Sequence, residues 1–366
     1  MRIGILKIGG RLTWDSIDKT GGIGEAKAIC ELMAYSPDNT VNIYTKMLKN
    51  ERSNPINNIY IQDINEVDEI EDDVLIVFNG NVNFFGGQED PEQIKNYILM
   101  NKFEGKVYYI FIDPELYLKQ IYNSISKKEW GEKYNIDDIE ITRDDIRVIT
   151  SIYNKEEAYK KITKGKIPIQ NNNIFYFPFE KYPLMKEGLP YTNDLWYDLM
   201  YMGTFRSGKR EDKMIKFYFG HTKFTTTFIG KTKLKDFKKE YPEPVPIFEK
   251  PVKFEEINQH INRSVAHVCI GDKFYEGNIL TPRIYESILN STVCLIDIDM
   301  DPEKRVFADS EALKKFNYVE DKEDVGKKVD RLKNNPEFRK KIIEHQQRTI
   351  DFTVDKYHKQ FMELIV

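Results

Sequence analysis

The sequence is poor in cysteine. Its three cysteines, Cys30, Cys269 and Cys294, form no C-x-x-C pair among 366 residues. Closely spaced cysteines are what disulfide frameworks and structural zinc sites require. Their scarcity argues against both, and it favours a protein that works in a reducing cytosol.

Long hydrophobic runs are also missing. No stretch approaches the roughly 20 apolar residues of a membrane span, and the opening "MRIGILKIGG" has too short an apolar run for a signal peptide. Positive charge is not in excess either, because the net charge is -4 at pH 7. We therefore expect a soluble intracellular protein with no membrane partner, in which any contact with nucleic acid comes from local clusters of cations.

A chain of this length is expected to fold as two domains rather than one. Near-continuous apolar runs alternate with helical patterns, which is typical of parallel sheets covered on both faces. Three prolines within 177–190 mark the joint, so we predict two doubly wound α/β domains with ligands at the carboxyl ends of strands. Strands are predicted at 2–8, 41–46, 73–80, 106–113, 145–153, 195–205, 225–230, 264–272 and 291–299, and helices at 25–35, at 281–289 and from about 336 onward.

The stretch "GTFRSGKRE" (203–211) places three cations around a glycine, directly after an apolar run. It nearly matches the phosphate loop GxxxxGK[ST], but Arg210 stands where that loop needs a hydroxyl for magnesium, so an NTPase is not expected. A strand, a glycine turn and a helix start with Arg206 and Arg210 favour a diphosphate site, because guanidinium groups and helix N-termini both bind phosphate. The alternative is a solvated helix start, with Glu211 and Asp212 offsetting the charge.

The segment "TPRIYES" (281–287) predicts a second helix start. Thr281 suits the N-cap and Pro282 the first helical position, so Arg283 and Glu286 lie on one face of the first turns. An arginine there can meet a phosphate, while a carboxylate one turn later accepts hydrogen bonds from ribose hydroxyls. The alternative is an ordinary ion pair within the helix.

Two carboxylates of the first domain stand at the ends of predicted elements. "TGGIGEAKAICE" (20–31) is a glycine-rich turn that opens a helix, and it lacks the GxGxxG spacing of a dinucleotide site. Glu25 in its first turn either bonds sugar hydroxyls or simply complements the helix dipole. Asp113 ends the run "KVYYIFID", where a general base would stand and where capping aspartates are also common.

Five blocks of the sequence form a recognisable pattern: "NVNFFGG" (81–87), "KVYYIFID" (106–113), "FYFPFEKY" (175–182), "MGTFRSGKREDKM" (202–214) and "IGDKFYEGNILTPRIYE" (270–286). In this order and at these spacings, they resemble the family of DNA β-glucosyltransferases of T-even bacteriophages. The resemblance runs from the first strand into the C-terminal helix, and the FFGG and FRSG blocks together are its most specific part.

The resemblance implies a phage-encoded enzyme of the GT-B architecture, with two Rossmann-like domains that face a central cleft. Residues 1–184 would form the domain on the DNA side, together with a C-terminal helix at about 350–366 that packs back on it. Residues 185–349 would form the UDP-sugar domain. The implied reaction moves glucose from UDP-glucose to the hydroxymethyl group of 5-hydroxymethylcytosine in double-stranded DNA, with inversion at the sugar and flipping of the target base.

The same resemblance assigns catalytic and DNA-side residues. Asp113 falls on the catalytic base and Glu25 on a second acidic group near the sugar and the acceptor. Asn83 and Phe85 fall in a segment suited to the DNA side, where an aromatic ring can fill the space left by a flipped base.

The donor site is assigned in the same way. Its positions by resemblance are Arg206, Arg210 and Arg283 at the diphosphate, Gly203 and Thr204 beside it, Val252 with its backbone facing the uracil, Glu286 at the ribose, and Asp272 and Glu180 as further acidic residues. The resemblance also implies a divalent cation, Mg or Mn, although no metal-ligand cluster stands out in the sequence. It further implies a monomer that acts in the cytoplasm of the host cell.

A pair of aspartates in "LIDIDMD" invites a different interpretation. Asp297 and Asp299 lie two residues apart on a predicted strand, like the D-x-D metal site of another glycosyltransferase class. That class has a different fold, so we expect this pair to end a strand and not to hold a metal.

The acceptor side departs from the family pattern. Glu115 stands where the family has an arginine, so DNA contacts would rely on basic stretches such as 231–241 and 160–166, which can also be read as solvated surfaces. Hydroxymethyluracil, another UDP-sugar, or a small-molecule or glycan acceptor therefore remain alternatives. From a different class, the chain could be a noncatalytic DNA- or nucleotide-binding protein on the same scaffold, although such a protein needs no base like Asp113.

Overall fold

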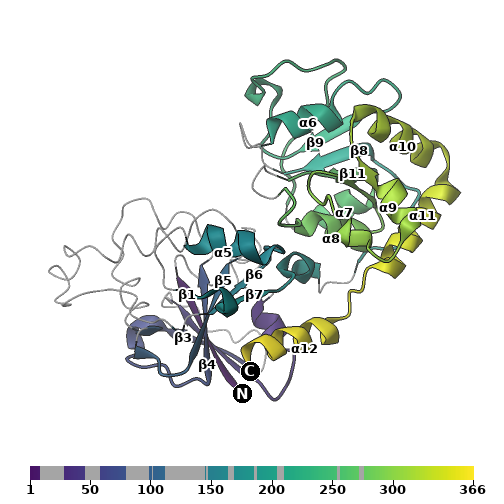
Figure 1. Cartoon of the computed structure of the whole chain (residues 1–366). Coiled ribbons are helices and arrows are strands. Elements are labelled where there is room, and N and C mark those ends of the chain that lie inside the picture. Colours follow the sequence, from purple (N-terminus) through teal and green to yellow (C-terminus); the bar gives the residue numbers. More distant parts are fainter. Residues whose placement is uncertain are drawn as a thin grey trace. The chain divides into compact units, whose positions relative to one another are not determined.

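The chain divides into two compact units. The first comprises Met1–Pro183 and Thr353–Val366, and the second comprises Leu184–Phe352 (Figure 1). The computed structural model describes residues 1–8, 29–45, 58–79, 99–100, 102–111, 145, 147–163, 169–184, 188–203, 210–253, 256–271 and 276–366.

The first unit is built on a parallel sheet of seven strands. Their order is β3-β2-β1-β4-β5-β6-β7, so the order reverses between β1 and β4. Apolar side chains on the central strands, such as Ile5, Ile43 and Val77, are almost fully buried, as expected for a sheet covered on both faces. The strands are β1 (Arg2–Ile8), β2 (Thr40–Thr45), β3 (Ile59–Asp63), β4 (Val74–Asn79), β5 (Lys106–Phe111), β6 (Arg147–Thr150) and β7 (Ile174–Tyr176), and helix α5 spans Lys155–Thr163.

The last helix of the chain, α12 (Val354–Ile365), belongs to the first unit. Phe361 of this helix is fully buried, and its ring centroid lies 5.0 Å from that of Phe177 in an edge-to-face contact. His358 Nδ1 lies 2.8 Å from the carbonyl oxygen of Leu32. The predicted return of the C-terminal helix to the first domain is thus confirmed.

The second unit repeats the same strand order with six parallel strands. The order is β10-β9-β8-β11-β12-β13, and it reverses between β8 and β11. The strands are β8 (Tyr197–Met202), β9 (Thr226–Ile229), β10 (Ile247–Glu249), β11 (Ser264–Cys269), β12 (Val293–Asp297) and β13 (Tyr318–Val319).

Alternate residues of the central strands point into two separate apolar clusters. On β12, Val293 and Leu295 join a cluster with Met214 and Val329, while Cys294 and Ile296 join another with Ile284. Both faces of the second sheet are therefore covered by helices. These are α6 (Glu211–Tyr218), α7 (Ile257–Asn262), α8 (Pro282–Leu289), α9 (Glu311–Asn317), α10 (Lys322–Asn334) and α11 (Pro336–Thr349).

Several predicted boundaries differ from the structure. The helical tail predicted from residue 336 is two helices, because α11 ends at Thr349 and α12 begins at Val354. The short strands β3, β7, β10 and β13 and the helices α5, α7, α9 and α10 were not predicted. The predicted helix start after "GTFRSGKR" is confirmed, since α6 begins at Glu211. Within the residues described above, no helix has both the length and the hydropathy needed to cross a membrane.

Candidate functional site

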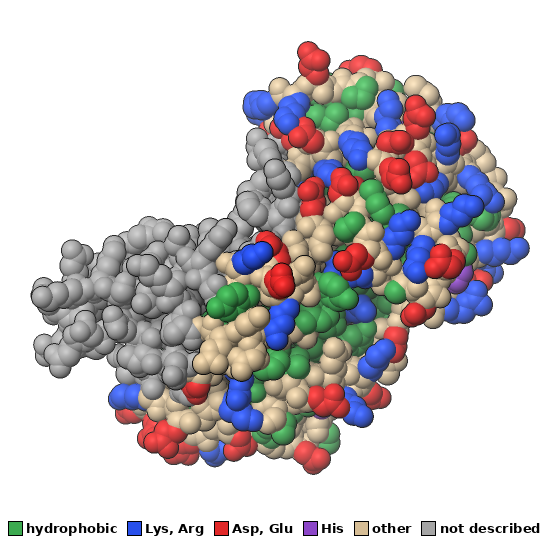
Figure 2. Space-filling model, viewed as in Figure 1, with side chains coloured by type: hydrophobic (Ala, Val, Ile, Leu, Met, Phe, Trp, Pro, Cys, Tyr) green, Lys and Arg blue, Asp and Glu red, His purple; other side chains and the backbone are tan. Residues whose placement is uncertain are grey.

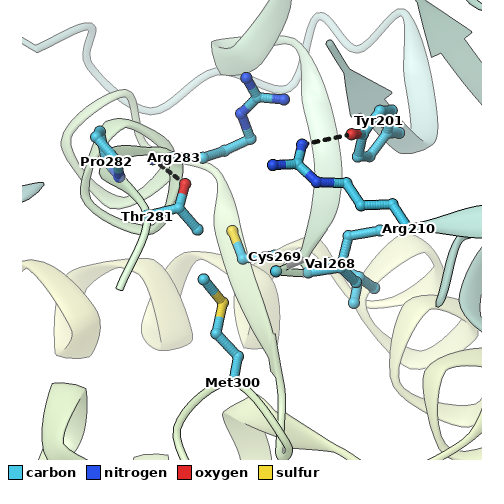
Figure 3. A pocket seen from close by; sticks show the side chains of 10 residues that line it. Tyr201, Arg210, Val268, Cys269, Thr281, Pro282, Arg283 and Met300 are labelled. Carbon is cyan, nitrogen blue, oxygen red and sulfur yellow. Dashed lines mark hydrogen bonds between the residues drawn. The ribbon is translucent and has the colours of Figure 1, made fainter. Parts of the chain in front are cut away.

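A cavity of about 180 Å³ opens at the carboxyl ends of β8 and β11, the two strands between which the order of the second sheet reverses (Figure 3). Open α/β sheets bind their ligands at this point, because the loops that follow the two strands diverge and leave a crevice. The described residues that line the cavity are Tyr201, Arg210, Val268, Cys269, Ile270, Gly271, Thr281, Pro282, Arg283 and Met300.

Two glycines let the ends of β8 and β9 come close together beside the cavity. Gly203 follows β8 with φ 153°, and Gly230 follows β9 with φ 150°. A Cβ atom on Gly230 would stand 2.1 Å from the carbonyl oxygen of Gly203, so no other residue fits there without moving the backbone. The strand predicted before Gly203 is confirmed, while residues 204–209 lie outside the described chain.

Arg210 is the N-cap residue of α6. Its Nη1 donates a hydrogen bond of 3.2 Å to the phenol oxygen of Tyr201 on β8. Figure 3 shows this bond as a dashed line, with the Arg210 guanidinium reaching toward the cavity. The helix N-terminus adds a partial positive charge at the same place.

Helix α8 begins on the other side of the cavity, and its start follows the predicted capping pattern. Thr281 is the N-cap, its Oγ1 accepts a 3.1 Å hydrogen bond from the backbone N–H of Arg283, and Pro282 takes the first helical position. Arg283 therefore lies in the first turn of α8, and it lines the cavity. No ion pair joins Arg283 to Glu286 or to any other residue that the structure describes, so the simple intrahelical pair is not formed.

The guanidinium groups of Arg210 and Arg283 both lie next to Tyr201. Arg283 Cζ lies 5.8 Å from the centroid of the Tyr201 ring, and the phenol oxygen of the same ring accepts the bond from Arg210. Among the described residues that line the cavity there are two arginines and no acidic side chain. Such a wall attracts an anion, and paired arginines match phosphate oxygens bidentately. Ligand pockets usually measure about 300–1,000 Å³, so the cavity accommodates one part of a nucleotide sugar.

Glu286 lies one turn beyond Arg283 on α8. Burial raises the pKa of its carboxyl group, although the positive charge of Arg283 acts in the opposite direction. The buried ring of His267 on β11 lies behind this turn, and its Nδ1 is 3.1 Å from Ser287 Oγ. Ser287 Oγ in turn donates a 2.8 Å hydrogen bond to the carbonyl of Arg283. Burial, assisted by the charge of Arg283, lowers the pKa of His267 to about 3, so this ring is neutral at pH 7.

Two other predicted donor-site residues are described. Val252 follows β10 in the second unit and packs, partly buried, against a small apolar cluster that includes Met202 and Ile229 at the ends of β8 and β9. Glu180 belongs to the first unit, where it is 4% exposed and Tyr176 donates a 3.4 Å hydrogen bond to its Oε1. The remaining predicted site residues lie outside the described chain: Glu25, Asn83, Phe85, Asp113, Thr204, Arg206 and Asp272.

Asp297 and Asp299 have a cationic partner that the sequence did not reveal. Lys213 on α6 forms an ion pair of 2.6 Å with Asp297, a second with Asp299, and a longer one of 3.6 Å with Glu276. Burial alone would lower the pKa of Lys213, but the two aspartates raise it overall. This aspartate pair is therefore joined to a lysine, and in the part of the chain that the structure describes no group of three acidic, histidine or cysteine side chains could hold a metal ion.

Comparison with known proteins shows what this chain is similar to. Residues 40–183 match the family model described as bacteriophage T4 beta-glucosyltransferase. A known relative, the DNA beta-glucosyltransferase of Enterobacteria phage T4, is 29% identical over 307 residues, which cover 81% of this chain and 83% of the relative. The chain is a homologue of the T4 β-glucosyltransferases. The resemblance predicted from the five sequence blocks is thus confirmed.

Solved structures of the T4 enzyme match along the whole chain. An aspartate-to-alanine variant of it in complex with UDP-glucose superposes with a TM-score of 0.80 and 27% identity, covering 100% of this chain and 99% of that one. The T4 enzyme in complex with UDP and Mn²⁺ superposes with a TM-score of 0.78, 26% identity and the same coverage. These matches confirm the GT-B fold class, and they show two relatives that carry a uridine diphosphate group.

Proposed function

We propose that the chain transfers glucose from UDP-glucose to the hydroxymethyl group of a modified base in double-stranded DNA. One observation carries this proposal. In a homologue of the T4 DNA β-glucosyltransferase, the cavity at the switch point of the second sheet is walled by Arg210 and Arg283 and by the starts of two helices. This arrangement is suited to the diphosphate of a UDP-sugar.

The donor would lie along the second unit. Arg210 and Arg283, joined by Arg206 from the preceding segment of the sequence, would hold the diphosphate, with Gly203 and Thr204 beside it. Glu286, one turn beyond Arg283, would accept hydrogen bonds from the ribose hydroxyls, and the backbone at Val252 would face the uracil. Asp272 and Glu180 are further acidic positions that the family resemblance assigns to the donor. The neighbouring cations stabilise the negative charge that the diphosphate gains as it leaves.

The acceptor side would come from three segments of the first unit. Glu25, the pair Asn83 and Phe85, and Asp113 belong to the chain segments that follow β1, β4 and β5. These are neighbouring strands at the reversal of the first sheet, so their carboxyl ends share one edge, which is where α/β sheets place ligands. The three segments were predicted separately, and each follows one of three neighbouring strands. This supports their assignment together to the acceptor side.

The chemistry follows from these roles. Asp113 would take the proton of the hydroxymethyl group as its oxygen attacks the anomeric carbon of glucose from the face opposite UDP, so that one displacement inverts the α linkage to β. Because this hydroxyl lies inside a stacked duplex, the target nucleotide must first be flipped out, at a cost of a few kcal/mol. Phe85 would fill the space that the base leaves, and Glu25 would act as a second acidic group near the sugar.

A divalent cation, Mg or Mn, is expected with the diphosphate, as in the T4 complex that contains Mn²⁺. The described residues offer no set of protein ligands for it, and none of those that line the cavity carries a carboxylate. We therefore derive no step through a metal, and charge stabilisation is assigned to the arginines.

Contact with DNA would depend on local cation clusters. Figure 2 shows Lys and Arg side chains interspersed with Asp and Glu over the visible surface, as expected for a net charge of -4. The densest lysine run in the described chain is the segment 231–239, whose five lysines are all exposed. Only Lys239 forms an ion pair there within the described structure, with Asp212 at 2.6 Å. Exposed, unpaired lysines bind phosphates by releasing counterions, which makes the affinity depend on salt.

This lysine segment is fixed beside the candidate donor site. Thr232 Oγ1 donates a hydrogen bond of 3.4 Å to the carbonyl of Gly203. At the other end of the segment, the buried carboxylate of Glu211 accepts hydrogen bonds from the backbone N–H groups of Lys238 and Lys239, the latter at 2.8 Å. Glu211 thus holds the backbone at one end of the lysine segment, in addition to offsetting the nearby positive charge. If DNA of an infecting phage is the acceptor, the chain acts in the host cytoplasm, and we expect it to do so as a monomer.

The proposal is tested by nucleoside mass spectrometry after incubation of the chain with UDP-glucose and three duplexes. The duplexes carry cytosine, 5-hydroxymethylcytosine or 5-hydroxymethyluracil at one position and are otherwise identical. We expect one hexose mass on 5-hydroxymethylcytosine alone. A hexose on 5-hydroxymethyluracil instead would change the acceptor but keep the reaction class. No transfer to any duplex, with UDP still bound, would contradict the DNA assignment.

A further inference from the structure

Tyr201 stands between the two arginines of the cavity, and nothing in its sequence context distinguishes it from a core residue. It is the fifth residue of β8 and is 4% exposed. Its phenol oxygen accepts the 3.2 Å hydrogen bond from Arg210 Nη1, and its ring lies 5.8 Å from Arg283 Cζ. One buried side chain therefore contacts guanidinium groups that come from two different helices.

The ring of Tyr201 is itself held in place. It packs edge to face on Tyr218, with centroids 5.5 Å apart, and on Phe228, with centroids 5.4 Å apart. Gly203 faces the same ring, because a Cβ atom there would stand 3.4 Å from the phenol oxygen and 3.3 Å from Arg283 Nη1. This aromatic ring is held at the end of a central strand, so it can keep both arginine side chains in a fixed position.

Two arginines in one small cavity repel each other before an anion binds, and each long side chain has rotamer entropy to lose when it is fixed. A phenol oxygen that accepts a hydrogen bond from one guanidinium and a ring face near the other reduce that repulsion. Fixing the side chains before binding also lowers the entropy lost when the diphosphate arrives. Both effects act on the phosphate-binding arginines rather than on the uridine.

We propose that Tyr201 is a positioning residue that holds Arg210 and Arg283 ready for the diphosphate of the donor. This proposal rests on the proposed function, since it assumes that the cavity binds a UDP-sugar. It makes a specific claim: loss of the phenol hydroxyl should weaken binding of ligands that carry a diphosphate and leave binding of the nucleoside unchanged.

The test is calorimetric titration of the full chain with UDP and with uridine, for the wild type and for Tyr201→Phe. This substitution keeps the ring and its packing and removes only the hydroxyl. We expect the Kd of UDP to rise about 10- to 100-fold, the range for loss of one hydrogen bond to a charged group. The Kd of uridine should stay within about twofold.

A matched control separates positioning from general destabilisation. Tyr318 is 5% exposed, and its phenol hydroxyl donates one hydrogen bond to the carboxylate of Asp301. It contacts neither arginine. Tyr318→Phe should therefore lower the melting temperature about as much as Tyr201→Phe and leave the ratio of the UDP and uridine affinities at its wild-type value.

A second variant shows whether Tyr201 acts through Arg210. In an Arg210→Met background, Tyr201→Phe should cause a further loss of UDP affinity clearly smaller than in the wild type, because the bonded guanidinium is already gone. A full further loss would overturn the positioning role. If the wild type prefers UDP to uridine and Tyr201→Phe keeps that preference, only the inference about Tyr201 is contradicted, and the proposed donor site stands. If the wild type shows no preference for UDP, the proposed donor site falls with it.

Discussion

Single residues at the carboxyl end of β8 shape the wall of the candidate donor site. Tyr201, Gly203 and Arg210 come from ten consecutive residues, yet they supply a hydrogen-bond acceptor, a close backbone approach and a cation. Arg283 completes this group from a distant helix. Substitutions here should therefore produce distinct effects on binding and on turnover.

Asp113 and Arg283 should show such distinct effects. Asp113→Ala is expected to abolish nearly all glucose transfer and to leave UDP affinity unchanged, because the proposed base would act only on the acceptor. Arg283→Ala should weaken UDP binding and also lower kcat by about 10²–10³, because the guanidinium stabilises charge that develops as UDP leaves. Steady-state kinetics with isothermal titration of UDP separate the two.

The control for this pair is Arg263→Ala. Arg263 lies on the surface, stacked 4.2 Å from the centroid of the Trp196 ring and paired with Asp194, and it does not line the cavity. It should retain wild-type kinetics. Near-normal turnover in Asp113→Ala would contradict the assignment of Asp113 as the general base.

Gly230 and Gly326 should respond to alanine in opposite directions. Gly230→Ala forces a methyl group against the carbonyl of Gly203 at a positive φ, so we expect a loss of about 1–3 kcal/mol in the free energy of unfolding and weaker UDP binding. Gly326 lies inside α10, where a Cβ atom would meet only His221 Nδ1 at 3.6 Å. Gly326→Ala should stabilise the protein by about 0.5–1 kcal/mol.

Urea titrations of the two alanine variants measure these changes. A stable Gly230→Ala variant with normal UDP affinity would mean that β8 and β9 need not approach so closely at the site.

At the scale of elements, the lysine segment 231–239 links the donor site to the surface. Its two anchors, Thr232 and Glu211, bind the backbone of the site and of the segment rather than the lysine side chains. The exposed lysines can therefore be changed without disturbing the anchors. This separation makes the segment suitable for a test of DNA binding.

Replacing Lys231, Lys233 and Lys235 by alanine should weaken duplex DNA binding and reduce the slope of log K against log salt by about 1 for each DNA phosphate that is no longer neutralised. UDP affinity should not change. Fluorescence anisotropy of a labelled duplex at several salt concentrations gives both quantities. The control is the triple alanine variant of Lys315, Lys327 and Lys341, which are exposed on α9, α10 and α11. Equal weakening of DNA binding in both triple variants would argue against a specific role for the segment.

Prediction from the sequence was most successful for elements with long apolar runs. The central strands β1, β4, β8, β11 and β12 were all found, because their side chains are buried on both faces and form continuous runs. The strands β3, β7 and β10 are short and less buried at sheet positions near the edge, so no such run marks them.

The same contrast holds for the site. Arg210 and Arg283 were predicted because cations near a glycine turn and a capped helix start are unusual, whereas Tyr201 looks like any aromatic residue in a buried strand. Its contact with Arg210 becomes visible only when the strand end and the helix start are placed together. Lys213 was missed for a similar reason, since its partners Asp297 and Asp299 lie more than 80 residues away.

At the scale of the whole molecule, ionisable groups are distributed unevenly between the two units. Four of the five histidines, His221, His260, His267 and His345, lie in the second unit, and only His358 lies in the first. Burial lowers the pKa of His221, His260 and His267 in the folded state. Below about pH 6.5 these histidines bind protons in the unfolded chain but less readily in the folded chain. The stability that the neutral histidines contribute is therefore lost as pH falls.

We therefore predict that the second unit loses stability between pH 7.0 and pH 5.5. For His267, with a pKa of about 3, the loss amounts to roughly 1 kcal/mol. Hydrogen exchange of the amides of β11 and β12, corrected for the intrinsic rate, measures it, and β4 and β5 of the first unit serve as the internal reference. His267→Asn should make the second unit less sensitive to acid. An unchanged pH dependence in this variant would show that other groups cause the effect.

The assignment of α12 to the first unit has a consequence for synthesis of the chain. The second unit is continuous, whereas the first is assembled from two segments that enclose it in the sequence. At about 5–20 residues per second, a ribosome needs roughly ten to thirty seconds to translate Leu184–Phe352. During that time the nascent first unit lacks Phe361, whose ring packs on Phe177 in the complete fold. The unit translated second can thus complete its fold before the unit translated first.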